Sequence, residues 1–431
     1  MALKTRDTQT QVKHLILSKY LAEWAGVIIN GLSKIARFRL SRGLSFGARL
    51  LYVDGFSFTG RYAGDASAIV RQEGPTWGSP LLGIQALDNA CQFAQAMYQF
   101  PIETASILVE DDAEDFQELL ESLRLAGLSH RVVTNPSTIN PMNGQILAIH
   151  GDFLKLVDAI LRVAEQPYTW SFFLLDPYGP KGIPYEMVKR VVAQQHVDAM
   201  INQPYQDLYK KQGILDSQKE KAVNEALLRN YDAMFGTQEW REVRQQVWQN
   251  TFEPERGAQL EAELTTFYQR RLRTADPSLA VKKIGLEFPD RERTMFYLFL
   301  TTHDPTGALL MNKVLYDAEQ QEAQLKWQRQ EATVVQKARQ MGQMSLYDIG
   351  LDPAAPPPDA SPQRVVSIDQ LANELFASFQ GKAVTLKAIY LSQVDSHYFA
   401  EDIRKALRHL RQQKRVQYQE LQIESQIRFM K

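Results

Sequence analysis

The sequence predicts an α/β protein: a doubly wound, mostly parallel sheet with a helical insertion, followed by a winged-helix-like domain. Short apolar runs recur along the first half of the chain, and amphipathic helical segments separate them. Strands that are apolar on both faces are typical of parallel sheets covered by helices on both sides. After residue 364 the pattern changes to three helices and a terminal hairpin, which predicts the winged helix.

The elements of the sheet region follow in order from a helix over residues 10–40, where apolar side chains repeat at helical spacing. Five strands are expected, at Ala48–Val53, Glu103–Asp111, Gly144–Asp152, Trp170–Gly179 and Val197–Pro204. A polar, helix-rich insertion covers about residues 206–285. The segment Arg293–Gln320 is expected to close the sheet with an antiparallel pair around a turn at Asp304.

Three segments make up the predicted organisation. Residues 1–340 form the sheet-containing domain, and residues 365–431 form the winged-helix-like domain. Between them, residues 341–364 are rich in proline and alanine and show no periodic apolar face. Such a composition is typical of a linker that is extended where prolines cluster.

Composition excludes several classes of function. The net charge of −1 gives no overall attraction to nucleic acid or membranes. Because Cys91 is the only cysteine, an intrachain disulfide and a cysteine-based metal site are excluded, and Cys91 reads as a small buried apolar residue. The N-terminal residues show no signal region, and no stretch approaches about 18 uninterrupted apolar residues. We therefore expect a cytoplasmic protein with no membrane partner and no metal site.

The first predicted strand ends in a glycine-bearing loop, Tyr52–Gly64. In doubly wound sheets, ligands bind beyond the carboxyl ends of the strands, where the first turn lets backbone approach the ligand. Gly55 and Gly60 can supply that turn, and Asp54 can accept a hydrogen bond from a ligand. The loop contains no dinucleotide or triphosphate signature, so a plain strand-to-helix turn remains an equal alternative.

Acidic residues also end the next two predicted strands. Glu110 can accept hydrogen bonds from two ribose hydroxyls, because a carboxylate has two acceptor oxygens. Asp152 can accept from an adenine amino group. Helix capping is the alternative at both strand ends. After Glu110 the capping residue would be Asp112, and at the next strand end it would be Asp152 itself.

The fourth predicted strand ends in Asp176, Pro177, Tyr178 and Gly179. An acceptor followed by an aromatic ring can hold an extruded base beside a reactive group, which makes Asp176, Pro177 and Tyr178 the candidate catalytic residues. A structural turn stiffened by proline is the alternative. Four successive strands that end in a carboxylate at one edge favour a ligand site over chance.

Several segments resemble the three-Cys-motif partner (TcmP) family, within the Rossmann-like S-adenosylmethionine-dependent methyltransferases. The resemblance covers about residues 10–320 and rests on Lys13–Trp24, Tyr52–Gly60, Gly78–Leu81, Phe173–Gly179, Ile201–Pro204, Met234–Trp240 and Phe299–His303. It implies a methyltransferase-like fold, S-adenosylmethionine as cofactor, and a partner protein that carries three cysteines.

The resemblance also implies roles for individual residues. Asp54, Gly55, Phe56 and Gly60 take the positions of the loop on the methionine side of the cofactor. Glu110 takes the ribose position, Asp152 the adenine position, and Asp176–Gly179 the reaction side. The family loop usually reads Asp-Gly-Phe-Ala-Gly-x-Gly, and here Phe58 replaces the first of its two later glycines. A phenyl ring at that position crowds a cofactor.

The C-terminal segment is locally basic. Residues 364–431 contain 11 Lys and Arg against 7 Asp and Glu, a difference of +4. Four arginines lie on one stripe of a predicted helix: Arg404, Arg408, Arg411 and Arg415. Such a stripe suits contacts with DNA or RNA phosphates, and a solvated face or a protein-interaction module is the alternative.

Two functions of different classes remain open at this point. The first is a methyltransferase that acts on or near nucleic acid. The second is a non-catalytic protein of methyltransferase fold that binds nucleic acid as the partner of a three-cysteine protein, which Phe58 favours. Another nucleotide-using α/β enzyme is a third, weaker interpretation.

Overall fold

The computed structural model describes residues 3–6, 8–44, 46–64, 76–98, 100–177, 183–203, 221–252, 255–288, 291–320 and 364–430. The chain divides into two compact units. The first contains Met1–Leu3, Leu21–Tyr62 and Trp77–Ala308, and the second contains Lys4–Tyr20, Ala63–Thr76 and Leu309–Lys431.

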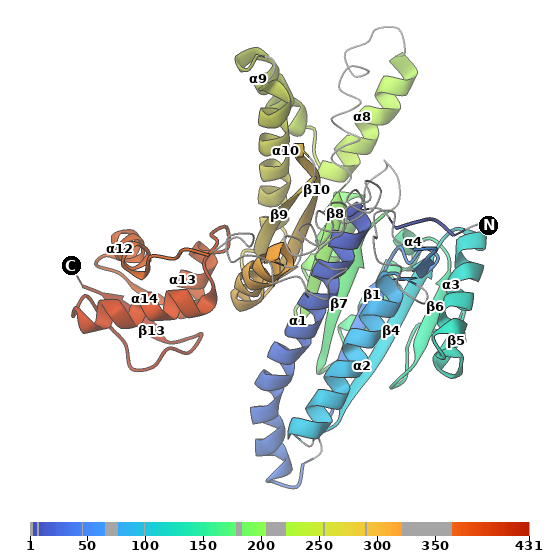
Figure 1. The fold of residues 1–431 in the computed structure, drawn as a ribbon, viewed down its shortest axis with the longest axis horizontal. Coiled ribbons are helices and arrows are strands. Elements are labelled where there is room, and N and C mark those ends of the chain that lie inside the picture. The colour runs from blue at the N-terminus through green and yellow to red at the C-terminus, as the bar shows by residue number, and fades with distance from the viewer. Residues whose placement is uncertain are drawn as a thin grey trace, which may run out of the picture. The chain divides into compact units, whose positions relative to one another are not determined.

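An eight-stranded sheet is the core of the first unit (Figure 1), in the order β5-β6-β4-β1-β7-β8-β10-β9. Its strands are β1 (Ala48–Asp54), β4 (Ile102–Glu110), β5 (Val132–Thr134), β6 (Ile146–His150), β7 (Thr169–Leu175), β8 (Val197–Gln203), β9 (Ala280–Phe288) and β10 (Arg291–Thr302). Neighbouring strands from β5 to β8 are parallel, whereas β10 is antiparallel to both β8 and β9. The short strands β2 (Arg61–Tyr62) and β3 (Thr76–Trp77) are not part of this sheet.

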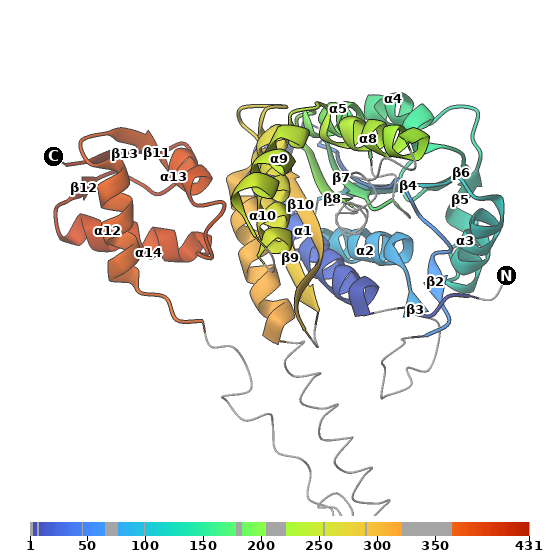
Figure 2. The ribbon, with the colours of Figure 1, turned by 90° about the horizontal axis from the view of Figure 1, so that it is seen from above.

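Helices cover both faces of the sheet, as Figure 2 shows. They are α1 (Thr8–Leu40), α2 (Ser79–Tyr98), α3 (Ala113–Leu125), α4 (Phe153–Ala164), α5 (Tyr185–Val192), α8 (Lys221–Phe235), α9 (Trp240–Asn250) and α10 (Arg256–Arg273). The helices α4, α5 and α8 lie over one face, and α2 lies over the other. Because the strands are buried on both faces, they read in the sequence as continuous apolar runs.

The five predicted parallel strands are confirmed, and their boundaries differ from the predicted ones by at most four residues. The predicted end of the sheet is wrong, because residues 305–320 are helical instead of forming a second strand. Asp304 accepts a hydrogen bond from the amide of Thr306 at 2.9 Å, and Pro305 occupies the first helical position, so the turn starts a helix. The antiparallel partner of β10 is β9, and the sheet therefore resumes at Ala280, before the predicted end of the helical insertion.

This arrangement is an α/β fold with a mostly parallel central sheet, and it is compatible with a methyltransferase-like fold. The strand order reverses at β1, since β4, β6 and β5 continue to one side while β7 and β8 continue to the other. Ligands of doubly wound sheets bind at such a reversal, beyond the carboxyl ends of the strands.

Among the described helices, one segment, Thr10–Leu40, is long and apolar enough to cross a membrane by length and composition. Its part in the first unit packs into the core. The ring of Trp24 meets Phe172 edge-on at 5.6 Å, and its Nε1 donates to Oδ2 of Asp198 at 2.9 Å. The core helix of a folded domain passes the same test of length and composition.

The C-terminal residues of the second unit form three helices and a three-stranded antiparallel sheet. The elements are α12 (Ile368–Phe379), β11 (Ala383–Thr385), α13 (Leu386–Ser392), α14 (Ala400–Gln412), β12 (Val416–Gln417) and β13 (Gln426–Phe429), with the strand order β11-β13-β12. Ser367 caps α12 and Thr385 caps α13 through their side chains. The predicted three helices and terminal hairpin are present, and β11 was not predicted. Of the predicted linker, only Arg364 lies within the described residues.

Candidate functional site

The carboxyl ends of β1, β4 and β7 lie side by side in the sheet. Asp54, the last residue of β1, pairs in register with Leu108 of β4 and Leu174 of β7. Backbone hydrogen bonds continue past the strand ends, because the amide of Gly55 donates to Leu174 at 3.1 Å and that of Ser57 donates to Val109 at 2.9 Å. We call this part of the sheet, at the reversal of strand order, the carboxyl edge.

Three of the predicted acidic residues share one face of the sheet at the carboxyl edge. Residues paired in register on parallel strands point to the same side, and alternate residues repeat that side. Glu110 and Asp176 each lie two residues beyond the partners of Asp54, so all three point to the face that α2 covers. The charge of Asp176 contributes to raising the pKa of Asp54, which agrees with this proximity.

Asp54 is completely buried and fixes the loop that follows it. Its Oδ2 accepts hydrogen bonds from the hydroxyls of Ser79 at 2.7 Å and Tyr52 at 3.1 Å, and its Oδ1 accepts from the amide of Phe56 at 3.2 Å. Burial raises the pKa of Asp54 to about 6, although these hydrogen bonds act against the shift. The carboxylate thus joins β1, the start of α2 and the loop.

The backbone of this loop is already hydrogen-bonded within the protein. The amides of four consecutive residues, Gly55, Phe56, Ser57 and Phe58, donate to protein acceptors. A side chain at Gly55 would meet the ring of Phe153 at 3.1 Å, and one at Gly60 would meet Leu119 at 2.9 Å. Packing therefore accounts for both glycines, and Gly60 also has a positive φ of 69°.

Glu110 connects the end of β4 to the same loop. Its Oε2 accepts the amide of Phe58 at 2.6 Å, and its Oε1 accepts the amide of Asp112 at 3.0 Å. The side chain is 8% exposed, and this burial raises the pKa of Glu110 to about 7. Phe58 has a φ of 51°, in the left-handed region where glycine is favoured.

The predicted helix caps are confirmed. Asp112 accepts from the amides of Glu114 and Asp115 at the start of α3, and Asp152 accepts from the amide of Leu154 at 2.9 Å at the start of α4. The side chain of Asp152 remains 41% exposed. Capping therefore does not prevent Asp152 from contacting a ligand, and its adenine role stays a prediction.

Asp176 and Pro177 lie at the end of β7, whereas Tyr178 and Gly179 lie outside the described residues. Asp176 is half-buried, and its Oδ1 accepts the Nδ2 amide hydrogen of Asn202 at 2.7 Å. Asn202 belongs to the segment Ile201–Pro204 that supports the family resemblance, but the sequence assigned it no role. The same holds for Ser79, whose hydroxyl bonds to Asp54.

Two other groups do not belong to the carboxyl edge. Asp198, whose pKa burial raises to about 7, lies near the start of β8, at the opposite end of the strand. Cys91 is half-buried on α2, and its thiol donates to the carbonyl of Ile102 at 3.3 Å. Within the described ranges, no three His, Cys, Asp or Glu side chains gather as metal ligands do.

The four arginines of the predicted basic stripe fall into two pairs. Arg404 and Arg415 are half-buried and contact their own domain. Nε of Arg404 donates to the hydroxyl of Tyr390 at 2.8 Å. Arg415 donates to Oδ1 of Asn373 at 2.9 Å and lies 3.8 Å from the centroid of the Phe376 ring.

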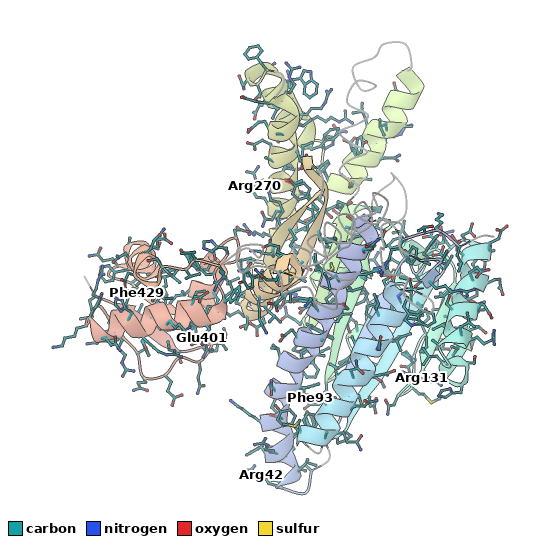
Figure 3. All side chains as sticks on the ribbon, in the orientation of Figure 1. Arg42, Phe93, Arg131, Arg270, Glu401 and Phe429 are labelled. Carbon is teal, nitrogen blue, oxygen red and sulfur yellow. The ribbon has the colours of Figure 1, made fainter. Side chains whose placement is uncertain are left out.

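The other pair, Arg408 and Arg411, is exposed. Arg408 forms a salt bridge of 3.0 Å with Glu401, which Figure 3 labels on α14. Arg411 lies 4.7 Å from the centroid of the Tyr418 ring. Exposed ion pairs contribute only about 0–1 kcal/mol, so a phosphate can compete for these two side chains.

No family model matches the chain, and no curated protein matches it. Among solved structures, a Legionella pneumophila protein of family model DUF519 is similar with a TM-score of 0.34 and 11% identity, over 69% of this chain and 86% of that chain. A protein from Galdieria sulphuraria, described as a candidate sarcosine dimethylglycine methyltransferase, is similar with a TM-score of 0.21 and 11% identity, over 65% and 83%. Similarities this weak carry no argument, and the description of the fold rests on the strand order.

Proposed function

We propose that this chain is an S-adenosylmethionine-dependent methyltransferase of the three-Cys-motif partner type, acting on or near nucleic acid. One observation carries the proposal. Asp54, Glu110 and Asp176 end adjacent parallel strands on one face of the sheet, where the strand order reverses. Carboxylates in this position suit a ligand that presents hydroxyl and amino groups.

The residues at the carboxyl edge fit the cofactor in part. Within the described residues, each carboxylate oxygen of Glu110 accepts one amide hydrogen, and each can accept a second hydrogen bond. That capacity suits the two hydroxyls of a ribose. Asp152 is open to the adenine amino group, while Asp54 holds the loop and acts through it. The bound cofactor would supply an electrophilic methyl group.

On the reaction side, Asp176 and Pro177, with Tyr178, are proposed to hold the acceptor. Their contribution is position, because aligning a nucleophile in a fixed geometry can supply a large part of the rate enhancement. Asn202 orients Asp176 through the 2.7 Å hydrogen bond. Because Asp176 follows β7 and Asn202 belongs to β8, this hydrogen bond fixes the Asp176 side chain between two strands of the sheet.

Calorimetry with S-adenosylmethionine tests this proposal. We expect a binding heat and a higher melting temperature at millimolar cofactor, because a ligand that binds only the folded state stabilises it. Asp152→Ser and Asp112→Ser form a matched pair, since both residues cap helices at this edge but only Asp152 is assigned to the cofactor. Loss of affinity in Asp152→Ser alone supports the assignment. No heat and an unchanged melting temperature in the wild type contradict the enzyme.

A second function is favoured by one observation: protein acceptors already occupy the backbone amides of the loop after β1. The amides from Gly55 to Phe58 are all bonded within the protein, and Phe58 stands where the family has glycine. These features support a non-catalytic protein of methyltransferase fold that binds nucleic acid beside a three-cysteine partner. Cofactor affinity that appears only after Phe58→Gly would support this alternative.

We also propose that the C-terminal elements form a winged helix that contacts DNA or RNA in the cytoplasm. The order helix, strand, two helices and a terminal hairpin supports the first part of this proposal. The exposed Arg408 and Arg411 support the second part.

A further inference from the structure

The C-terminal ends of α1 and α2 carry a group of exposed apolar side chains. Six large apolar residues are exposed on these helix ends and in the turn that follows α1: Ile35, Phe38, Leu40, Leu44, Phe93 and Met97. Phe38 is 55% exposed and Met97 is 63% exposed. Single exposed apolar side chains are ordinary, whereas a group of them in one place indicates an interaction surface.

Contacts between the two helix ends join these side chains into one surface. The guanidinium of Arg37 on α1 lies 5.9 Å from the centroid of the Tyr98 ring on α2. The ring of Phe93 meets that of Tyr98 edge-on at 6.0 Å. On α1 itself, the guanidinium of Arg42 lies 4.2 Å from the centroid of the Phe38 ring. Figure 3 labels Arg42 and Phe93 at this end of the two helices.

The charged side chains of these helix ends are all cations. Three exposed cations accompany the apolar side chains: Lys34, Arg37 and Arg42. Residues 24–53 and 89–102 contain no Asp or Glu. The two acids that border the second range, Asp88 and Glu103, each form a salt bridge with an arginine. We call the six apolar residues and the three cations the basic-apolar patch, and its charge is complementary to an anionic partner.

The basic-apolar patch lies at the edge of the sheet opposite the carboxyl edge. Along the chain, α1 leads into the start of β1 and α2 leads into the start of β4. These two strands are parallel neighbours, so both helix ends lie at the amino ends of the strands. A partner can therefore bind the patch without covering the carboxyl edge.

We infer that the basic-apolar patch binds the surface of a membrane that contains anionic lipids. At such a surface, apolar side chains enter the boundary between headgroups and acyl chains, while Lys and Arg meet the lipid phosphates. Nucleic acid would use the cations but leave the aliphatic side chains in water. A second copy of the chain would bring cations of the two patches together, which is unfavourable.

The net charge of −1 does not oppose this binding. Exposed charges that are more than a Debye length of about 10 Å apart are largely screened, so local charge decides the attraction. Total charge and the search for spanning segments, on which the expectation of no membrane partner rests, do not register a local patch.

Co-sedimentation of the full chain with vesicles tests the inference. Vesicles of phosphatidylcholine with about 30% phosphatidylserine are compared with vesicles of phosphatidylcholine alone. Each cation near an anionic surface strengthens binding roughly fivefold, so three should favour the anionic vesicles by on the order of 100-fold. The preference should fall as the salt concentration rises. No binding to the anionic vesicles, or equal binding to both kinds, overturns the inference.

A pair of phenylalanine variants tests the apolar part of the patch. Phe38→Gln should weaken binding to the anionic vesicles by about tenfold or more, because the ring no longer leaves water on binding. Phe252→Gln is the matched control, since Phe252 is 77% exposed but follows α9, outside the patch. Binding that Phe38→Gln leaves unchanged, or that Phe252→Gln weakens equally, contradicts the inference.

Arginine variants test the cationic part. Arg42→Gln should weaken binding to the anionic vesicles roughly fivefold. The double variant Arg408→Ala, Arg411→Ala is the control, because it removes two exposed cations of the C-terminal domain. It should bind the vesicles as the wild type does. Loss of binding in this control would assign the lipid contact to the C-terminal domain and overturn the inference.

The same variants identify other occupants of the patch. A dimer in sedimentation velocity that Phe38→Gln dissociates would identify a second copy of the chain. Binding of an acidic amphipathic peptide in place of the vesicles, abolished by Phe38→Gln, would identify a protein partner. Either result overturns the inference. The proposed function is tested separately, because Phe38→Gln should keep the S-adenosylmethionine affinity of the wild type.

Discussion

Glu110 holds Phe58 in place: Oε2 of the carboxylate accepts the backbone amide of Phe58 at 2.6 Å, across 52 residues of sequence. Phe58 adopts a left-handed conformation that costs an ordinary residue about 1–2 kcal/mol. A short hydrogen bond to a carboxylate stabilises that conformation, because charge-assisted bonds are about twice as strong as neutral ones. The loop at the carboxyl edge is thus fixed by an acid that the sequence assigns to a ligand.

Glu110 should make stability depend on pH. Burial raises its pKa from 4.5 to about 7, so the folded state binds more protons than the unfolded state between these values. The contribution to stability is present below pH 4.5 and is lost as the pH rises through 7. Glu110→Gln cannot ionise, and its unfolding free energy relative to wild type should increase between about pH 5 and pH 8.

Chemical denaturation at several pH values measures this difference. The control is Glu114→Gln, an exposed acid in the first turn of α3, which should keep the pH profile of the wild type. A Glu110→Gln profile parallel to that of the wild type would contradict the raised pKa. Subtracting the wild type is necessary because Asp54, with a pKa of about 6, adds a slope of the same sign.

Phe58→Gly tests whether the phenyl ring of Phe58 keeps S-adenosylmethionine out of the loop after β1. The change relieves the left-handed strain of about 1–2 kcal/mol, and the greater freedom of glycine in the unfolded chain offsets about 0.5–1 kcal/mol of it. Stability should therefore change little, while S-adenosylmethionine affinity, measured by calorimetry, should increase because the ring no longer crowds the loop. Phe58→Ala is the control that removes the ring but keeps the strain. A loss of existing cofactor binding in both variants would show that the ring contributes to the site.

Gly83, the single glycine of α2, should not tolerate a larger residue. A Cβ added there would overlap the ring of Tyr52, which is completely buried and bonded to Asp54. Gly83→Ala should destabilise the protein by about 1–3 kcal/mol through overpacking, even though alanine favours helices. Gly31→Ala is the matched control on α1, where a Cβ meets no atom within 4 Å. It should stabilise by up to about 1 kcal/mol, and similar melting temperatures for both variants would contradict the packing argument.

The parallel strands were predictable because burial on both faces leaves a continuous apolar run. The strand β9 was missed for the opposite reason: Ala280–Phe288 contains two lysines and a glycine. Lys282 is nevertheless buried, and Gly285 lies where a Cβ would meet the ring of Tyr297 at 3.0 Å. The segment therefore forms a strand because of its tertiary packing, which a local sequence pattern does not reveal.

The sequence could predict where the acidic residues of the candidate site lie, but not which groups they contact. Strand order places Asp54, Glu110 and Asp176 together, and the sequence located all three at strand ends. It could not show that Asp54 and Glu110 both accept hydrogen bonds from the loop after β1, since those partners depend on side-chain geometry. The contact of Asn202 with Asp176 was not predicted, because the sequence of a strand end does not show which side chain its polar residues meet.

The division of the basic stripe predicts which arginines affect nucleic-acid binding. Arg408 and Arg411 are exposed, so each that neutralises a phosphate contributes about 0.9 to the slope of log affinity against log salt concentration. Arg408→Ala and Arg411→Ala should each lower that slope by about this amount, measured by fluorescence anisotropy between about 50 and 200 mM salt. Duplex DNA and single-stranded RNA are compared in the same series.

Arg404→Ala is the structural control, because Arg404 is half-buried and bonded to Tyr390. It should lower the melting temperature of the protein and leave the salt slope close to that of the wild type. Equal slopes for the wild type and for Arg408→Ala, Arg411→Ala and their double variant would mean that this face of α14 does not contact phosphates. The two exposed arginines would then only face solvent, and the proposal that the C-terminal domain binds nucleic acid would be wrong.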